Sequence, residues 1–258
     1  MTQRSLLGML PAMKLSMAAA GFGLGSSLLA GCTGGTETGN PVVVTGSLSY
    51  TGYSSAPEHI GVGEGGDVAT VSSAWFQLER VGISAEGCGN GRGQDFDIAA
   101  LGLGDHAAGA HVSTAYSAEA GIFCSLELPF VSTSEETAAP EELRGHAILL
   151  TGELPDGTAF SIVSDAQPRL LLEADTSGFE LAQGVADALV AFDFATWLDA
   201  MDFASADLDS SGIVVSATSN PGLLEQFESN LAAGVVLYRD ADADGVLDAE
   251  PEELARVR

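Results

Sequence analysis

The stretch RGHAILLTGELPDGTAFSIVS, residues 144–164, contains two short apolar runs separated by turn residues. In both runs, apolar side chains mostly alternate with polar or small ones, which is typical of half-buried β-strands. Pro155, Asp156 and Gly157 lie between the runs, where proline presets one turn dihedral and glycine permits a positive φ. The stretch therefore predicts an antiparallel hairpin made of strands 144–154 and 158–164.

Six further segments have the same short, mostly alternating character and are bounded by Gly, Pro, Asp or Ser. They are residues 42–50, 71–83, 121–130, 168–174, 185–194 and 212–217. Regularly spaced short strands favour a mainly β fold, and we expect an antiparallel β-sandwich of immunoglobulin-like or transthyretin-like type. A parallel sheet would need crossover helices, for which the spacing leaves no room.

Two helices are expected beside these strands. Residues 194–201, FATWLDAM, form the first, with Asp193 as its N-cap. The second covers residues 221–239, because Pro221 suits the first helical position and apolar residues follow at helical spacing. These apolar residues are Leu224, Phe227, Leu231, Val235 and Tyr238. We expect this helix to pack on the sheet and to lead directly into an acidic loop at residues 240–251.

The acidic loop begins with DADADGVLD, residues 240–248, which has the clearest metal-binding pattern of the chain. It resembles an EF-hand calcium loop, in which carboxylates at alternating positions converge on one ion and a glycine allows the sharp turn. The resemblance implies Ca²⁺ as the cofactor, because hard oxygen ligands suit Ca²⁺ better than Zn²⁺. It implies these ligands: Asp240, Asp242, Asp244, the backbone carbonyl of Val246, and Asp248.

The same loop departs from the EF-hand pattern at its twelfth position. Pro251 stands where the family has a bidentate glutamate, and Glu250, Glu252 or Glu253 would have to replace it in a shifted loop. An acidic, solvated turn without an ion is therefore the alternative interpretation.

The first 31 residues have the features of an export signal. Arg4 and Lys14 supply positive charge, and a run of small and apolar residues follows that is shorter than a membrane-spanning helix requires. Leu29, Ala30, Gly31 and Cys32 resemble the lipobox of bacterial lipoproteins. This resemblance implies cleavage before Cys32 and lipidation of its thiol, so that the mature chain is anchored in a membrane.

Residues 32–41 continue as a polar, glycine-containing tether that ends in TETGNP. A lipobox, such a tether and a β-rich body together resemble an uncharacterised lipoprotein family of Gram-negative bacteria. The resemblance implies a cell-envelope location, and the absence of Asp after Cys32 favours the outer over the inner membrane. We expect a signal peptide at 1–31, a lipidated tether at 32–41 and one β-rich domain at 42–258.

The part of the chain after the signal is strongly acidic. It contains all 36 acidic residues and seven of the nine basic ones, since Arg4 and Lys14 lie in the signal, which leaves a net charge of −29. All seven are arginines, so mechanisms that need a lysine are excluded. Such a charge repels nucleic acid, which is therefore not an expected partner. Divalent cations and cationic partners are favoured, although acidity for solubility alone is an equal explanation.

Cys88 and Cys124 remain once Cys32 is assigned to the lipid. In an oxidising compartment, two remaining cysteines most simply form a disulfide with each other. A catalytic cysteine is the alternative, and the apolar neighbours of Cys124 argue against it, because they would raise the pKa of its thiol. His106 and His111, which bracket HAAGAH, are a further candidate pair for a metal.

The sequence contains no recognisable constellation around a nucleophile. We therefore expect a lipid-anchored, non-catalytic structural, adhesion or binding module, held at the membrane by its lipid and contacting an envelope protein or polysaccharide. The alternative is an envelope hydrolase that acts on polysaccharide or peptide through carboxylates hidden among the many acidic residues.

Overall fold

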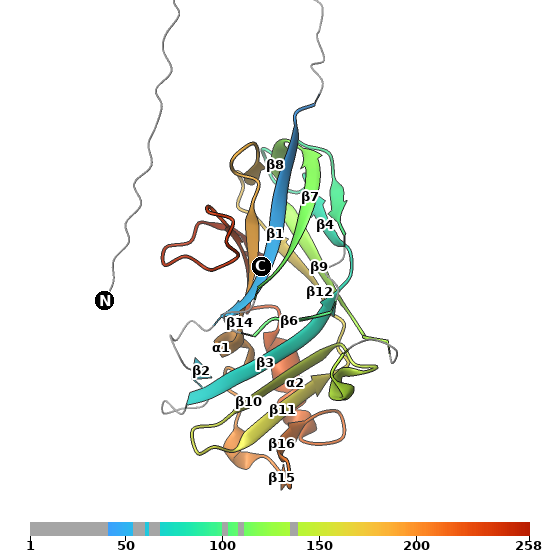
Figure 1. The fold of residues 1–258 in the computed structure, drawn as a ribbon, viewed down its shortest axis with the longest axis vertical. Coiled ribbons are helices and arrows are strands. Elements are labelled where there is room, and N and C mark those ends of the chain that lie inside the picture. The colour runs from blue at the N-terminus through green and yellow to red at the C-terminus, as the bar shows by residue number, and fades with distance from the viewer. Residues whose placement is uncertain (1–40, 54–59, 62–67, 100–102, 108–110, 135–138) are drawn as a thin grey trace, which may run out of the picture. The chain divides into compact units, whose positions relative to one another are not determined.

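The computed structural model describes residues 41–53, 60–61, 68–99, 103–107, 111–134 and 139–258. The signal, Cys32 and all of the predicted tether except Pro41 lie outside these residues. Every described element belongs to one compact unit, Asn40–Arg258, and Figure 1 shows that strands predominate in it. The mainly β class is therefore confirmed. Among the described residues, no helix is long and apolar enough to cross a bilayer.

The predicted hairpin is confirmed as β10 (Ile148–Glu153) and β11 (Ala159–Ser164), which pair antiparallel. Leu154 N donates to Thr158 O at 2.8 Å, and the Asp156 carboxylate accepts from Thr158 N at 2.8 Å. Gly157 has a φ of +83°, the left-handed conformation that glycine adopts at little cost. The turn chemistry of the sequence therefore fixes this pairing.

The other strands mostly coincide with the predicted segments. The predicted segment 71–83 forms two strands, and so does the segment 121–130. The sequence does not predict the strands His111–Glu119, Val235–Arg239 and Glu253–Val257.

The bounds of the remaining strands are β1 (Val43–Tyr53), β2 (Ile60–Gly61), β3 (Val68–Leu78), β4 (Val81–Ser84), β5 (Phe96–Ile98), β6 (Gly104–Asp105), β7 (His111–Glu119), β8 (Gly121–Phe123), β9 (Ser125–Val131), β12 (Arg169–Glu173), β13 (Phe179–Leu181), β14 (Ala188–Asp193), β15 (Leu208–Asp209), β16 (Gly212–Val215), β17 (Val235–Arg239) and β18 (Glu253–Val257).

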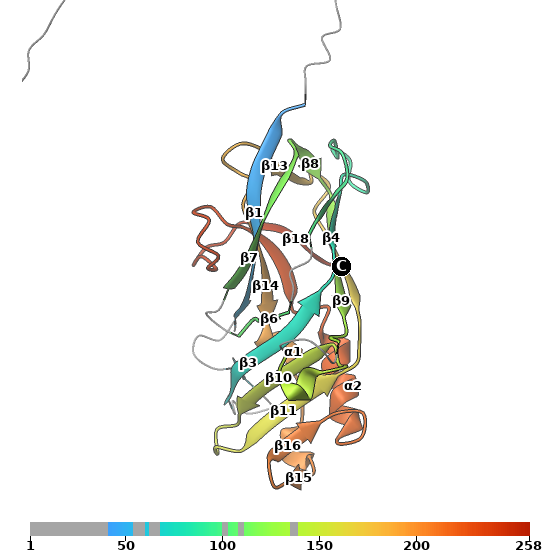
Figure 2. The same cartoon turned by 45° about the vertical axis from the view of Figure 1, so that its right-hand side comes forward.

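The expected antiparallel β-sandwich is not confirmed, because the main sheet is mixed. Its strands form one continuous path, β15-β16-β11-β10-β3-β9-β12-β18-β17-β14-β1-β7. Two pairs in this path are parallel, β1 with β14 and β11 with β16. The strands of each parallel pair lie far apart in the sequence. The chain between them forms other strands and comes back to the same end of the sheet, so no dedicated crossover helix is needed. Figure 2 shows β3 running from the lower strands up to β9.

The predicted helix 221–239 is wrong in its second half. Helix α2 covers only Pro221–Asn230, and the chain then turns and continues as β17. Leu224, Phe227 and Leu231 are buried at helical spacing, whereas Val235 and Leu237 are buried at strand spacing. Residues 235–238 are Val-Val-Leu-Tyr, which favour a strand, and β14 pairs with them. The acidic loop therefore leaves a strand and not a helix.

The core is rich in aromatic side chains and is closed by the short helix α1 (Phe194–Trp197), which is shorter than the predicted 194–201. The Asp193 carboxylate accepts from Ala195 N at 3.0 Å, as expected for its N-cap. Trp197 is fully buried and meets Phe227 of α2 edge to face at 6.0 Å between ring centroids. Helix α1 thus packs against α2 and β1, and α2 in turn packs against β11 and β16.

Candidate metal centre in the loop between β17 and β18

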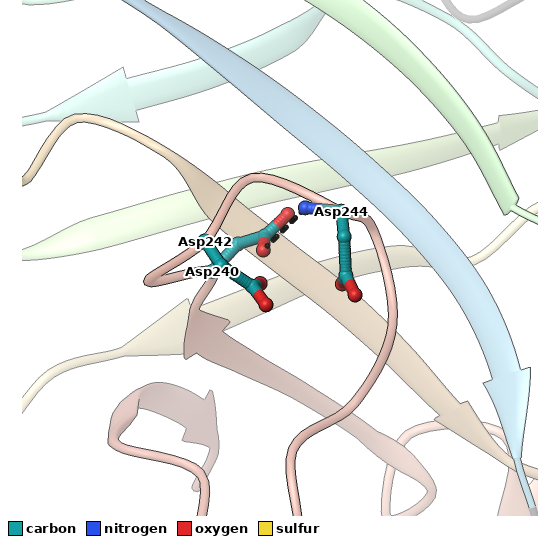
Figure 3. Close-up of side chains that lie close together, drawn as sticks. All are labelled: Asp240, Asp242 and Asp244. Atoms are coloured by element: carbon teal, nitrogen blue, oxygen red, sulfur yellow. Dashed lines mark hydrogen bonds between the residues drawn. The ribbon is translucent and has the colours of Figure 1, made fainter.

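Three aspartates of the acidic loop converge on one point. The loop joins β17 to β18, and one carboxylate oxygen each of Asp240, Asp242 and Asp244 lies within 4.8 Å of the others. Figure 3 shows the three side chains on the concave side of the loop. Asp240 is buried, with 3% of its surface exposed, whereas Asp242 and Asp244 are exposed. Together they form an all-carboxylate donor set that is open to solvent on one side.

Asp240 organises the loop through its own carboxylate. Oδ1 accepts from Asp244 N at 3.2 Å and Oδ2 accepts from Gly245 N at 3.1 Å, while Asp244 Oδ1 accepts from Val246 N at 2.8 Å. Ala243 and Gly245 have φ values of +58° and +72°, so the backbone turns sharply at both positions. These contacts curl the loop and bring the carboxylates together.

The electrostatics of the cluster favour a cation. Burial raises the pKa of Asp240, and the charges of Asp244 and Asp242 act in the same direction, although the hydrogen bonds from Gly245 and Asp244 oppose them. A partly buried carboxylate surrounded by like charges is in an unfavourable environment when it is ionised. A bound cation would remove this repulsion.

Arg239, the residue before Asp240, fixes the base of the loop. Its backbone N donates to Glu252 O at 2.8 Å, and its guanidinium donates to the carbonyls of Val185 and Glu180. The side chain is only 9% exposed and lies 3.7 Å from a Glu252 carboxylate oxygen. Asp240 N in turn donates to Asp187 O at 3.2 Å. Both ends of the loop are thus held to the sheet before any ion binds.

The structure brings together three of the four predicted carboxylate ligands. Asp248 is exposed and is not a member of the cluster. Sequence reasoning missed the role of Arg239. The sequence does indicate that this residue is unusual, because an arginine directly precedes the acidic run in a region with only seven basic residues.

The two remaining cysteines lie at disulfide distance, as predicted. Cys88 Sγ and Cys124 Sγ are 1.96 Å apart, and Cys124 is 3% exposed. The bridge joins the loop after β4 to the junction between β8 and β9. Gly89 N also donates to Thr176 O at 3.2 Å, so the cysteine loop is attached to the turn before β13.

Of the histidine pair, the structure describes the side chain of His106, whereas that of His111 lies outside the described part of the chain. His106 is buried and stacks on Phe76 at 4.0 Å between ring centroids. Neither of its ring nitrogens has a hydrogen-bond partner among the residues that the structure describes, and the same holds for the hydroxyl of the buried Tyr50. Burial lowers the pKa of His106 to about 4, against a smaller opposing effect of the Phe76 backbone. His111 begins β7, opposite Thr51.

Comparisons with known proteins give the following picture. No protein-family model matches the sequence, and no curated protein matches it. Among solved structures, the chain is similar to MbnP from Methylosinus trichosporium, with 12% sequence identity and a TM-score of 0.44. The alignment covers 66% of this chain and 83% of that one.

Proposed function

We propose that the protein is a lipid-anchored, non-catalytic binding module of the cell envelope, and that its β17–β18 loop binds Ca²⁺. The observation that carries the calcium proposal is the convergence of Asp240, Asp242 and Asp244 within 4.8 Å. All available ligands are oxygens, and no histidine or cysteine joins the cluster among the described residues. Calcium accepts six to eight oxygen ligands in flexible geometry, which suits a loop supplemented by water.

The site differs from an EF-hand in what surrounds the loop. Strands and not helices flank it, and the position of the bidentate glutamate is occupied by Pro251. The three carboxylates and the backbone carbonyl of Val246 are the protein ligands that we propose, with water completing the coordination. Fewer charged ligands give weaker binding, so we expect an affinity in the range of extracellular modules, with a Kd of about 10⁻⁴ to 10⁻³ M.

The anchoring proposal rests on the sequence before residue 42. The lipobox-like Leu29, Ala30, Gly31 and Cys32 support lipidation of Cys32, and the polar tether supports a body held outside the bilayer. We propose an outer-membrane location on the absence of Asp at position 33. An envelope protein or polysaccharide is the proposed partner.

Unfolding of the purified protein with and without Ca²⁺ tests the calcium proposal. A ligand that binds only the folded state stabilises it, by about 2.7 kcal/mol when it is present at 100 times its Kd. The stabilisation should vanish in the Asp242→Asn/Asp244→Asn double variant. It should persist in Glu225→Gln, which neutralises one exposed carboxylate on α2. Equal stabilisation in all three proteins would mean that the ion binds elsewhere.

A further inference from the structure

A cavity of about 680 Å³ opens beside the metal loop but does not include its aspartates. Strands β12 and β18 pair only at Leu172 with Val257 and at Glu173 with Arg256. Beyond these pairs the two strands separate, and the cavity lies between residues 252–256 and the segment 173–180. Its volume is within the range of small-ligand sites, about 300 to 1,000 Å³.

The walls of this cavity are fixed by contacts on both sides. On one side, the turn at residues 175–178 receives the hydrogen bond from Gly89 and packs on the disulfide, because a Cβ at Gly178 would lie 3.0 Å from Cys88 Sγ. On the other side, the Arg239 guanidinium is held by the carbonyls of Glu180 and Val185. The cavity is therefore formed in advance, which reduces the entropic cost of binding.

The lining of the cavity carries charges of both signs, with carboxylates in excess. It contains three of the seven arginines after the signal, Arg239, Arg256 and Arg258, and five carboxylates, Glu173, Asp175, Glu180, Glu252 and Glu253. Arg239 is held by backbone carbonyls and Arg256 is paired with Glu253, whereas the guanidinium of Arg258 makes no hydrogen bond to any described residue. An anionic ligand would meet repulsion from the carboxylates, and a purely cationic ligand would leave Arg258 without a partner.

Three larger apolar side chains contribute to the lining. Phe179 and Leu254 are 4% and 7% exposed, and Val185 is 38% exposed. Most of the other lining side chains are charged, so polar contacts dominate in this cavity and apolar contact is confined to a small part of it.

We propose that this cavity binds a short dipolar peptide, one that carries a free ammonium group and a free carboxylate with a small apolar side chain between them. The ligand's carboxylate pairs with Arg258, because a guanidinium offers donors in a geometry that matches a carboxylate. The ligand's ammonium group pairs with Glu173 and Glu180, and its side chain covers Phe179. This site is independent of the calcium loop, since the two share no proposed ligand.

Calorimetric titration with trialanine tests the proposal, in buffer with a chelator so that the metal loop takes no part. We expect saturable binding of one trialanine per chain in the millimolar range. The capped peptide N-acetyl-trialanine amide lacks both charges and should bind at least about tenfold more weakly. Succinate carries charge of one sign and should likewise bind at least about tenfold more weakly.

Two variants with the same change in charge complete the experiment. Arg258→Gln should weaken trialanine binding at least about tenfold. Arg169→Gln should leave it unchanged, because Arg169 pairs with Glu127 on the surface, outside the cavity. The absence of saturable heat, equal binding of the capped peptide or of succinate, or equal losses in the two variants would each overturn the proposal. None of these outcomes bears on calcium binding.

Discussion

The indole of Trp197 occupies the space into which a side chain at Gly234 would project. A Cβ at Gly234 would lie 2.4 Å from Trp197 Cδ1 and 2.9 Å from Asp193 O. Trp197 Nε1 also donates to Leu231 O at 3.0 Å, and Asp193 N donates to Gly234 O at 2.7 Å. This close packing ends α2, starts β17 and so determines where the acidic loop begins.

Gly234→Ala should therefore destabilise the fold, by about 1 to 3 kcal/mol, because the added methyl group overpacks the contact with Trp197. Gly222→Ala is the matched control, since Gly222 lies in α2 and a Cβ there meets nothing within 4 Å. The control should be neutral or slightly stabilising because alanine favours a helix. Urea unfolding measures the stability of both variants. A Gly234→Ala variant as stable as the control would contradict the packing described for Trp197.

His106 should make the fold sensitive to acid. The folded state binds a proton at His106 only near pH 4, whereas the unfolded chain binds it near pH 6.5. The unfolded state therefore holds more protons between these values, and stability falls as the pH drops from 6.5 towards 4. This one residue accounts for a loss of up to about 3 kcal/mol.

His106→Phe should remove this contribution and keep the stacking on Phe76. Chemical unfolding from pH 7.5 to 4.5 in the parent and the variant isolates it, because the other titrating groups are common to both. If the free energy of unfolding changes with pH in the same way in both proteins, His106 does not cause the acid sensitivity.

Asp240 should matter for stability even without calcium. Asp240→Ala leaves Asp244 N and Gly245 N without their acceptor, and each lost buried contact costs about 1 to 3 kcal/mol. Asp242→Ala removes an exposed carboxylate of the same cluster and should cost little. Urea unfolding in a chelating buffer compares the two. Equal losses would mean that the Asp240 contacts do not hold the loop.

Cys32→Ser should abolish attachment to the membrane, because it removes the thiol that the lipobox-like tetrad offers for acylation. Fractionation of cells that express the parent and the variant measures the distribution between membrane and soluble fractions. Cys88→Ser is the control at a cysteine that the structure places in the disulfide. If the Cys32→Ser variant fractionates with the membrane as the parent does, the anchor lies elsewhere.

The sequence predicts the β class and the best-marked turns because their signals are local. The Pro155-Asp156-Gly157 turn fixes its hairpin without help from the rest of the chain, and the Asp193 cap is likewise a contact of adjacent residues. The parallel pairs β1 with β14 and β11 with β16 join distant segments, and no local pattern specifies them.

Residues 231–239 fit the spacing of a helix and also that of a strand. Val235 and Tyr238 continue the helical spacing of Leu224, Phe227 and Leu231, but Val235 and Leu237 also fit a strand. The packing of Trp197 against Gly234 and the pairing with β14 decide between the two, and both are tertiary contacts. The aspartate cluster can be predicted because its members alternate within one short loop whose glycine permits a sharp turn, whereas its attachment through Arg239 to distant carbonyls cannot.

Calorimetric titration of the purified protein with CaCl₂ measures calcium binding by the β17–β18 loop without any coupled reaction. We expect one saturable site per chain that is lost in Asp242→Asn/Asp244→Asn and retained in Glu225→Gln. Saturable heat that is the same in all three proteins, or no saturable heat in the parent, would contradict calcium binding by this loop.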